Sequence, residues 1–209
     1  MQQVKRRAVG GAMGAAGVRP LTAVISRAVE KLTGIVPLQL GPGIKTGLNI
    51  RTDIPSQVGA DIVANAVAAM QLANVPLAVL AFGTATTLTG LSGSGELTSK
   101  LIYPGVRASL DSLSSQTAEL PSIAPDKPKS VLGKNTIDSM VSGIIYGNAA
   151  MVDGLLDRIA AEWNTESLNV IATGQLAETI IPYCRSRHDL CYEPNLTLLG
   201  LKQIYRLNS

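Results

Sequence analysis

Residues 77–87 have the sequence LAVLAFGTATT, in which an apolar run passes into a turn of small and hydroxyl-bearing residues. The apolar half has the length of a buried β-strand, and Pro76 opens it. The second half contains Gly83 and three threonines. Hydroxyls and free backbone N–H groups in such a turn can hold a phosphate without a lysine. We therefore predict a buried strand that leads into a nucleotide-binding turn.

One position in this stretch argues against an active site that handles phosphate or metal. Ala81 stands at the end of the predicted strand, where such an enzyme usually holds a carboxylate. An alanine methyl group neither coordinates a cation nor neutralises its charge. The stretch therefore indicates descent from a nucleotide-binding protein together with an impaired catalytic activity.

The composition is that of a folded α/β protein. The chain has 209 residues, enough for one large domain or two small ones with a real core. Because 46% of the residues are hydrophobic and 16% are charged, we do not expect disorder. Aromatic residues make up only 3%, so the core must consist of Ala, Val, Ile and Leu, as where helices pack closely on a sheet. The same scarcity argues against binding single-stranded nucleic acid by base stacking.

Charge and cysteine content exclude several classes of partner. The net charge is +3 and residues 5–7 form the only basic run, so we expect neither nucleic acid nor a membrane as partner. No apolar run reaches the length of a bilayer span. Cys184 and Cys191 flank the single histidine, His188, but a zinc site needs a fourth ligand. We therefore assign no metal ligand and expect the reduced cysteines of a cytoplasmic protein.

Hydrophobic spacing predicts alternating helices and strands. Helices are expected over residues 21–32, 60–70, 106–113, 136–163 and 195–206, and strands over residues 35–40, 77–81, 86–91, 96–101 and 168–172. The SGSG sequence of residues 92–95 predicts a hairpin turn, and the segment around the cysteines is expected to be a loop. Residues 10–20 resemble an eroded buried strand. This order of elements predicts the α/β class.

Six short segments carry a resemblance to one protein family. Three occur in that family's order and approximate spacing: Gly59-Ala60-Asp61, residues 81–87 and residues 133–136. Residues 104–106, 142–147 and 172–174 also look like its signatures. Each segment alone is weak, but the combination is specific. From about Val18 to its C-terminus, the chain resembles the type III pantothenate kinases.

The resemblance implies a fold and an activity. It implies the actin-like, sugar-kinase (ribonuclease H-like) α/β fold, in which two related domains hold ATP between them. We expect residues 1–78 to be the remnant of a truncated N-terminal domain and residues 79–209 to be a complete C-terminal domain. The implied reaction is the ATP-dependent phosphorylation of pantothenate to 4'-phosphopantothenate, the first step of coenzyme A biosynthesis. A homodimer, a divalent cation (Mg²⁺) with ATP, and potassium or ammonium are implied as well.

The resemblance also assigns roles to individual residues. Asp61 would be the catalytic base that takes the proton from the hydroxyl of pantothenate. The expected substrate-binding residues are Gly59, Ala60, Asp61, Ile62 and Thr136, and the expected ATP-binding residue is Thr84. Phosphoryl transfer needs mainly positioning and charge neutralisation, so a single carboxylate beside the acceptor hydroxyl suits this role.

Simpler structural roles remain open for the same residues. Asp61 and Thr136 each stand at the start of a predicted helix, where either side chain could be the N-cap. Thr84 and Thr87 could be ordinary strand residues. Capping and catalysis do not exclude each other.

Four departures from the family's pattern predict impaired activity. The family's opening Asp-x-Gly-Asn-Thr hairpin has no counterpart here, and Ala81 replaces an aspartate ligand of the monovalent cation, whose site is expected to be lost. Ile62 stands where many members have arginine, and Gln175 follows a single glycine where the family has two. A second hypothesis is therefore a catalytically inactive remnant that acts as a dimerisation or regulatory partner. A third is a degenerate product without a selected function.

Overall fold

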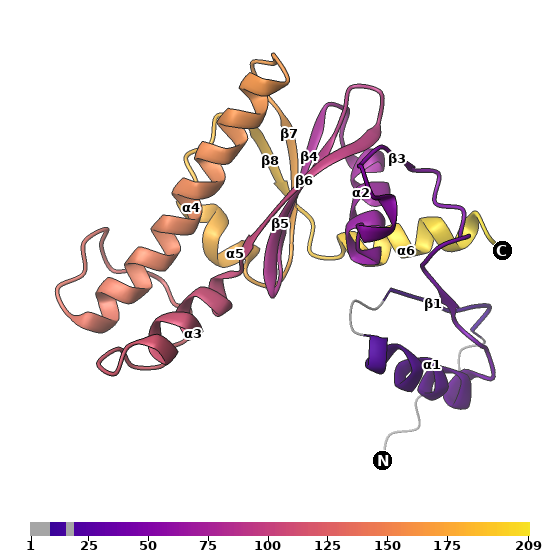
Figure 1. Cartoon of the computed structure of the whole chain (residues 1–209), viewed down its shortest axis with the longest axis horizontal. Helices are drawn as coiled ribbons and strands as arrows, with labels where there is room; N and C mark the ends of the chain where they lie inside the picture. The colour runs from indigo at the N-terminus through magenta and orange to yellow at the C-terminus, as the bar shows by residue number, and fades with distance from the viewer. Residues whose placement is uncertain (1–8, 16–18) are drawn as a thin grey trace. The chain divides into compact units, whose positions relative to one another are not determined.

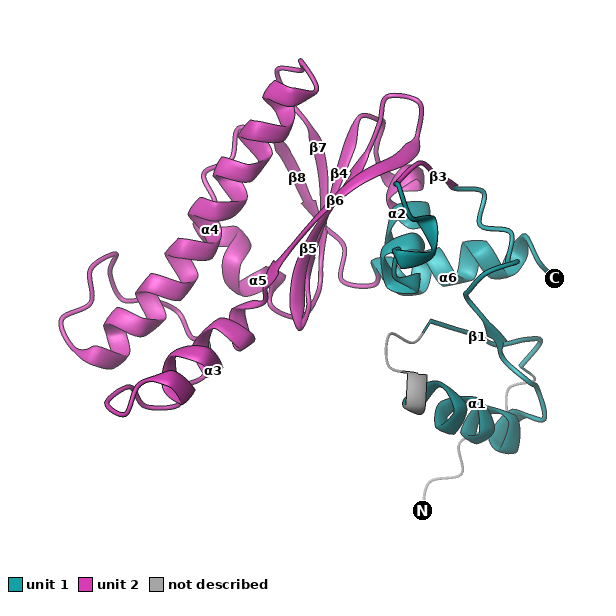
Figure 2. Ribbon diagram, viewed as in Figure 1, with its two compact units in different colours: residues 1–48, 53–68, 196–209 teal, residues 49–52, 69–195 magenta. Residues whose placement is uncertain are grey.

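The computed structural model describes residues 9–15 and 19–209, and only the backbone of residues 19 and 20. The chain forms two compact units (Figure 2), with residues 1–48, 53–68 and 196–209 in unit 1 and residues 49–52 and 69–195 in unit 2. Each unit has its own elements and is described by itself. The division into actin-like domains at residues 1–78 and 79–209 stays a prediction.

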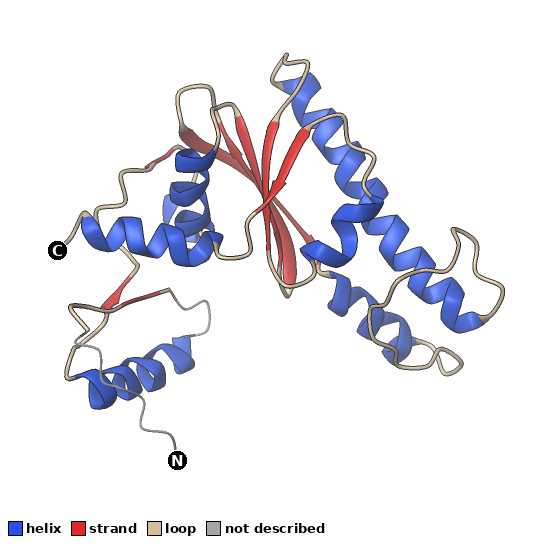
Figure 3. Cartoon of the chain, turned by 180° about the vertical axis from the view of Figure 1, so that it is seen from behind, coloured by secondary structure: helices blue, strands red, loops and turns tan. Residues whose placement is uncertain are grey.

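Unit 2 is built on a six-stranded sheet with the order β3-β6-β5-β4-β7-β8 (Figure 1). The strands are β3 (Asn49–Ile50), β4 (Leu77–Phe82), β5 (Ala85–Leu91), β6 (Glu96–Pro104), β7 (Asn169–Thr173) and β8 (Asp189–Tyr192). β4 and β6 both pair antiparallel with β5, whereas β7 is parallel to β4, β8 to β7 and β3 to β6. The predicted α/β class is confirmed, and Figure 3 shows these strands as one twisted layer.

β4 lies in the interior of this sheet. It pairs with β5 on one edge and with β7 on the other, so its backbone hydrogen-bonding groups are used on both sides. Residues 77–80 and Phe82 are buried, and Ala81 is half-buried. A strand that is covered on both faces has a continuous apolar sequence and not an alternating one. The strand predicted from the apolar run is confirmed and extends to Phe82.

The predicted hairpin turn is also confirmed. Residues 92–95 join β5 to β6, the Ser92 N–H donates to the Glu96 carbonyl at 2.9 Å, and the Gly95 N–H donates to the Ser92 carbonyl at 2.9 Å. Gly95 has φ 77°, a conformation that glycine adopts without the steric cost of a side chain.

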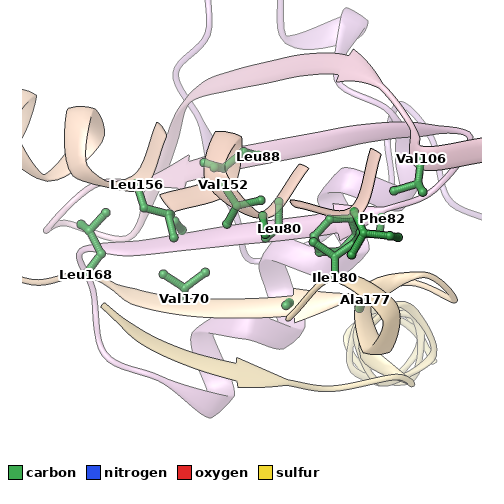
Figure 4. Packing of buried hydrophobic residues seen from close by; sticks show 14 of the residues in the cluster. Leu80, Phe82, Leu88, Val106, Val152, Leu156, Leu168, Val170, Ala177 and Ile180 are labelled. Carbon is green, nitrogen blue, oxygen red and sulfur yellow. The ribbon is translucent and has the colours of Figure 1, made fainter. Parts of the chain in front are cut away.

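The core of unit 2 lies between the sheet and the long helix α4 (Thr136–Glu162). Buried side chains recur on one face of α4, as an amphipathic helix requires. The core residues labelled in Figure 4 are Leu80, Phe82, Leu88, Val106, Val152, Leu156, Leu168, Val170, Ala177 and Ile180. Three of them come from α3 (Val106–Gln116) and α5 (Ala177–Ile180). Because each buried Val or Leu contributes roughly 1.5–3 kcal/mol, this cluster holds the helices on the sheet.

The segment around the cysteines differs from its prediction as a loop. After η2 (Ile181–Tyr183), residues 189–192 form the edge strand β8, which pairs in parallel with β7. Its sequence, DLCY, is too short to show a strand period, so the pairing depends on the exposed edge that β7 offers. Among the helices of the described residues, none combines the length and the apolar character needed to cross a membrane.

Unit 1 contains short strands and helices. Its elements are β1 (Met13–Gly14), α1 (Arg19–Thr33), β2 (Leu38–Gln39), η1 (Pro55–Gln57), the first part of α2 (Ala60–Leu72) and α6 (Leu196–Arg206). The strand predicted over residues 10–20 is limited to β1, which pairs in parallel with β2, and residues 16–18 lie outside the described residues. The Thr197 hydroxyl lies 2.6 Å from Asn65 Oδ1 and joins α6 to α2.

Candidate functional site

Thr84 lies with Gly83 in the tight turn between β4 and β5. The Gly83 N–H donates to the Ala85 carbonyl at 3.2 Å, and the Gly105 N–H donates to the Thr84 carbonyl at 3.2 Å. The second bond ties the turn to the start of α3. The Thr84 side chain is exposed. The prediction of free backbone N–H groups in this turn is wrong for Gly83, because its N–H group is already paired within the turn.

A second turn approaches the first at the end of β7. β4 and β7 are parallel neighbours, so their carboxyl ends lie at the same edge of the sheet. Gly174 follows β7 with φ 101°, and a Cβ at this position would lie 2.3 Å from the Phe82 carbonyl oxygen. No other residue fits there without moving the backbone, so the glycine allows the two turns to meet.

The two turns line one open hollow of about 620 Å³, which we call the Thr84 hollow. Its lining residues, all from unit 2, are Phe82, Gly83, Thr84, Arg107, Ala108, Asp111, Pro125, Gly174, Gln175 and Leu176. This volume is typical of small-molecule sites. Arg107 and Asp111 were not among the predicted site residues. The Pro-Gly pair at residues 104–105 signalled the start of a helix, but nothing in the sequence places that helix beside the Thr84 turn.

Ala81 lies between two threonines on one face of the sheet. It pairs directly with Thr87 of β5 and with Thr173 of β7. Directly paired residues on neighbouring strands project to the same side. Thr173 is buried and Thr87 is half-buried. The position therefore has neutral hydroxyls on both sides and a methyl group in the middle.

The predicted substrate residues 59–62 form the start of α2 in unit 1. The Val63 N–H donates to the Gly59 carbonyl at 3.0 Å, so Gly59 holds the N-cap position and Asp61 is the second helical residue. The alternative in which Asp61 is the N-cap is therefore wrong. A Cβ at position 59 would lie 2.5 Å from Asp61 Oδ1, so the carboxylate folds back over Gly59. Asp61 is exposed, whereas Ile62 is buried.

Thr136 is the first residue of α4. The N-cap is Asn135, whose side-chain oxygen accepts from the Asp138 N–H at 2.9 Å, so the alternative in which Thr136 is the cap is wrong. Hydrogen bonds from Lys129 and then from Asn135 lower the pKa of Asp138. Lys129 Nζ lies 3.0 Å from the carboxylate. These contacts order the loop that leads into α4.

Thr136 also lines a second hollow of about 600 Å³, which we call the Thr136 hollow. It lies between α3 and the first turns of α4, and its other lining residues include Leu113, Gly133, Met140 and Ile144. It shares no lining residue with the Thr84 hollow. Unit 2 therefore presents Thr84 and Thr136 in separate hollows, and Asp61 belongs to unit 1.

The cysteines and the histidine have structural surroundings. Cys184 and Cys191 are free thiols, and burial, with a smaller effect of the Asp153 carboxylate, raises the pKa of Cys184 to about 12. His188 Nδ1 accepts from the Leu168 N–H at 3.2 Å, and Nε2 lies 3.2 Å from Asp157 Oδ1. These contacts connect the residue that precedes β7, and α4, to the segment before β8. Over the described part of the chain, no group of three or more His, Cys, Asp or Glu residues could hold a metal ion.

Comparisons with known proteins agree with the motifs in the sequence. Residues 1–158 match the sequence model of the type III pantothenate kinase family. A type III pantothenate kinase from Bacillus cytotoxicus is 42% identical to this chain over 192 residues, which cover 92% of this chain and 72% of the relative.

A solved structure supports the fold. A conserved Baf family protein from Campylobacter jejuni, provisionally named a transcriptional activator, superposes with a TM-score of 0.56. The match covers 88% of this chain and 78% of that protein at 18% identity. At this identity the likeness concerns the fold alone.

Proposed function

The chain belongs to the type III pantothenate kinase family, and from this premise we propose that it transfers the γ-phosphate of ATP to the hydroxyl of pantothenate. The observation that carries the proposal is the 42% identity to a type III pantothenate kinase over 92% of the chain. The expected product is 4'-phosphopantothenate, made at a reduced rate. A homodimer, which the family resemblance implies, and a cytoplasmic location, which the reduced cysteines suggested, belong to the same proposal.

In this proposal Asp61 is the general base. Its carboxylate is exposed in the first turn of α2, and neither a hydrogen bond nor an ion pair from the described residues engages it. An acidic side chain in the first turn of a helix interacts favourably with the helix dipole. An ionised, accessible carboxylate is suited to receive the proton of an alcohol. Gly59, Ala60 and Ile62 shape the same end of the helix, and the family resemblance makes Thr136 of unit 2 a further candidate for binding pantothenate.

The Thr84 hollow is the proposed place of the ATP phosphates. The Thr84 hydroxyl and the backbone around Gly174 supply neutral polar groups there. One carboxylate, Asp111, also lines the hollow. Mg²⁺ keeps several waters and binds through one or two carboxylates together with substrate phosphates, so these residues fit an ion that arrives with the nucleotide. Bound there, the ion would neutralise phosphate charge.

A monovalent cation does not fit the surroundings of Ala81. Thr87 and Thr173 supply hydroxyl oxygens but no negative charge, and the methyl group occupies the place of a ligand. We therefore propose that the monovalent site is lost and that no step depends on it. The same observation favours a second candidate function, in which the chain binds substrates without turnover and acts as a dimerisation or regulatory partner.

The test of the proposed function is a direct assay of 4'-phosphopantothenate formation by mass spectrometry, with ATP, Mg²⁺ and pantothenate. We expect slow but measurable turnover by the full chain. Removing a general base costs about 10²–10⁴-fold, so Asp61→Asn should lower kcat by that factor. Asp53→Asn is the matched control, because Asp53 is also an exposed aspartate of unit 1.

Each outcome of this assay has a definite meaning. Equal turnover by the wild type and Asp61→Asn would remove Asp61 from the mechanism. Binding of ATP and pantothenate without any turnover would favour the second candidate function. Absence of both binding and turnover would overturn the proposal.

A further inference from the structure

Arg107 is the one positively charged side chain among the residues that line the Thr84 hollow. It is the second residue of α3, which begins at Val106. The hydrogen bond from the Gly105 N–H to the Thr84 carbonyl, 3.2 Å long, joins the start of α3 to the turn that carries Thr84. The backbone therefore holds Arg107 close to this turn.

The guanidinium of Arg107 has no protein partner among the residues that the structure describes. Neither a hydrogen bond nor an ion pair from these residues engages it, and its side chain is exposed in the hollow. Other arginines are engaged: Arg51 pairs with Glu96 at 3.1 Å, and Arg187 pairs with Asp157 at 3.0 Å. All five N–H donors of Arg107 therefore remain available to a ligand.

Asp111 is the nearest candidate partner by sequence, because it lies one helical turn further along α3 and lines the same hollow. The two side chains form no ion pair. An exposed pair at this spacing stabilises a helix by only about 0.3–0.5 kcal/mol. A purely structural role for Arg107 therefore has little support.

The hollow needs a positive charge if it receives a nucleotide. A triphosphate brings several negative charges, and no lysine lines the hollow. The Gly83 N–H, which could have faced a phosphate, is bonded to the Ala85 carbonyl. The start of α3 adds a favourable dipole, because its N-cap Gly105 has no side chain to occupy the first N–H groups.

From these observations, and resting on the proposed kinase function, the geometry points to Arg107 as the residue that binds and neutralises the phosphate chain of the nucleotide. The planar guanidinium can donate two parallel hydrogen bonds to phosphate oxygens, which an ammonium group cannot match. Asp111, one turn away, stays available for a divalent ion that accompanies the phosphates. Arg107 is in this view a binding residue and takes no part in proton transfer.

The test measures the affinity of the full chain for ATP, AMP and adenosine by calorimetry. The variants are Arg107→Gln and Arg107→Lys, and Arg158→Gln is the matched control, because Arg158 is exposed but outside the hollow. Loss of a charge-assisted contact should weaken ATP binding by Arg107→Gln about 10- to 100-fold and leave adenosine binding unchanged. We expect Arg107→Lys to fall between the wild type and Arg107→Gln, and Arg158→Gln to match the wild type.

Two results would contradict the inference while leaving the proposed function in place, and a third would overturn both. ATP binding by Arg107→Gln at wild-type affinity would remove Arg107 from the site while the kinase proposal stands. Equal losses for ATP and adenosine would mean that Arg107 shapes the hollow or contacts the nucleoside instead. Absence of ATP binding by the wild type would overturn both proposals together.

Discussion

The residue with the clearest chemical consequence is Ala81. Its methyl group lies between Thr87 and Thr173, so the position has oxygen atoms on both sides but no charge. Hydroxyl oxygens alone bind a monovalent cation weakly in competition with water. The sequence already showed that a carboxylate is missing. The pairing of β4 with β5 and β7 shows which groups surround the uncharged position, namely the two threonine hydroxyls.

We predict that Ala81→Asp creates a response to potassium that the wild type lacks. An unpaired, half-buried carboxylate destabilises the fold by about 1–3 kcal/mol, and a cation bound to it offsets part of that cost. The Tm of Ala81→Asp should therefore rise when choline chloride is replaced by KCl at equal ionic strength. The wild type and Ala81→Asn serve as controls and should show no such rise. A potassium-dependent Tm of the wild type would show that the site persists.

At the scale of single elements, the start of α4 shows which residue becomes the N-cap of the helix and why. The sequence offered Thr136 as cap, but the chain places Asn135 there and begins the helix at Thr136. Asn135 accepts from the Asp138 N–H and also donates Nδ2–H to the Asp138 carboxylate at 2.8 Å. One side chain thus satisfies a backbone donor and an anion in the first turn, which a threonine hydroxyl cannot do equally well.

We predict that Asn135→Ala lowers the free energy of unfolding by about 1 kcal/mol, because a backbone donor at the helix start loses its partner. Thr136→Ala is the matched control and should have a smaller effect. Chemical denaturation measures both. A larger loss for Thr136→Ala would contradict the assignment of the cap.

The loss of stability caused by Asn135→Ala should also depend on pH. The hydrogen bond from Asn135 helps to lower the pKa of Asp138 from its ordinary value of 3.8. This hydrogen bond therefore stabilises the folded state fully at pH values above 3.8. As the pH falls through the lowered pKa, Asp138 is protonated in both variants and the contribution is lost. The gap between the wild type and Asn135→Ala should therefore narrow below about pH 4.

At the scale of the whole molecule, unit 2 is held by one apolar cluster under α4. Leu156 is fully buried within it, beside Val152 and the strand residue Val170. The hydrophobic spacing in the sequence was sufficient to predict the long helix and its buried face. It could not predict the partners of that face, because these come from strands up to about 80 residues away in sequence.

We predict that Leu156→Ala lowers the free energy of unfolding by about 2–5 kcal/mol, since it removes buried methyl groups and leaves a cavity. Met151→Ala is the control, because Met151 is 40% exposed on the same helix. Denaturation monitored by circular dichroism measures both. Equal effects of the two substitutions would mean that α4 does not pack on the sheet as described.

Local sequence was enough for the elements that form from neighbouring residues. Helical spacing predicted α1, α2, α3, α4 and α6, the apolar run predicted β4, and the SGSG segment predicted the hairpin. Motif order led to the type III pantothenate kinase family, which the comparisons confirm. The residues that make up each of these patterns lie close together in the sequence, so each pattern can be recognised without the folded structure.

Local sequence patterns could not predict the contacts between residues that lie far apart in the chain. β8 is a strand because β7 has a free edge beside it, and the Gly83–Thr84 turn meets Gly174 because β4 and β7 are parallel neighbours. The same tertiary arrangement brings Arg107 to the Thr84 hollow. In the folded turn the Gly83 N–H is bonded to the Ala85 carbonyl and is therefore not free to bind a phosphate. Hydrogen bonds and packing between segments far apart in the chain set these arrangements, and no periodicity within one segment encodes them.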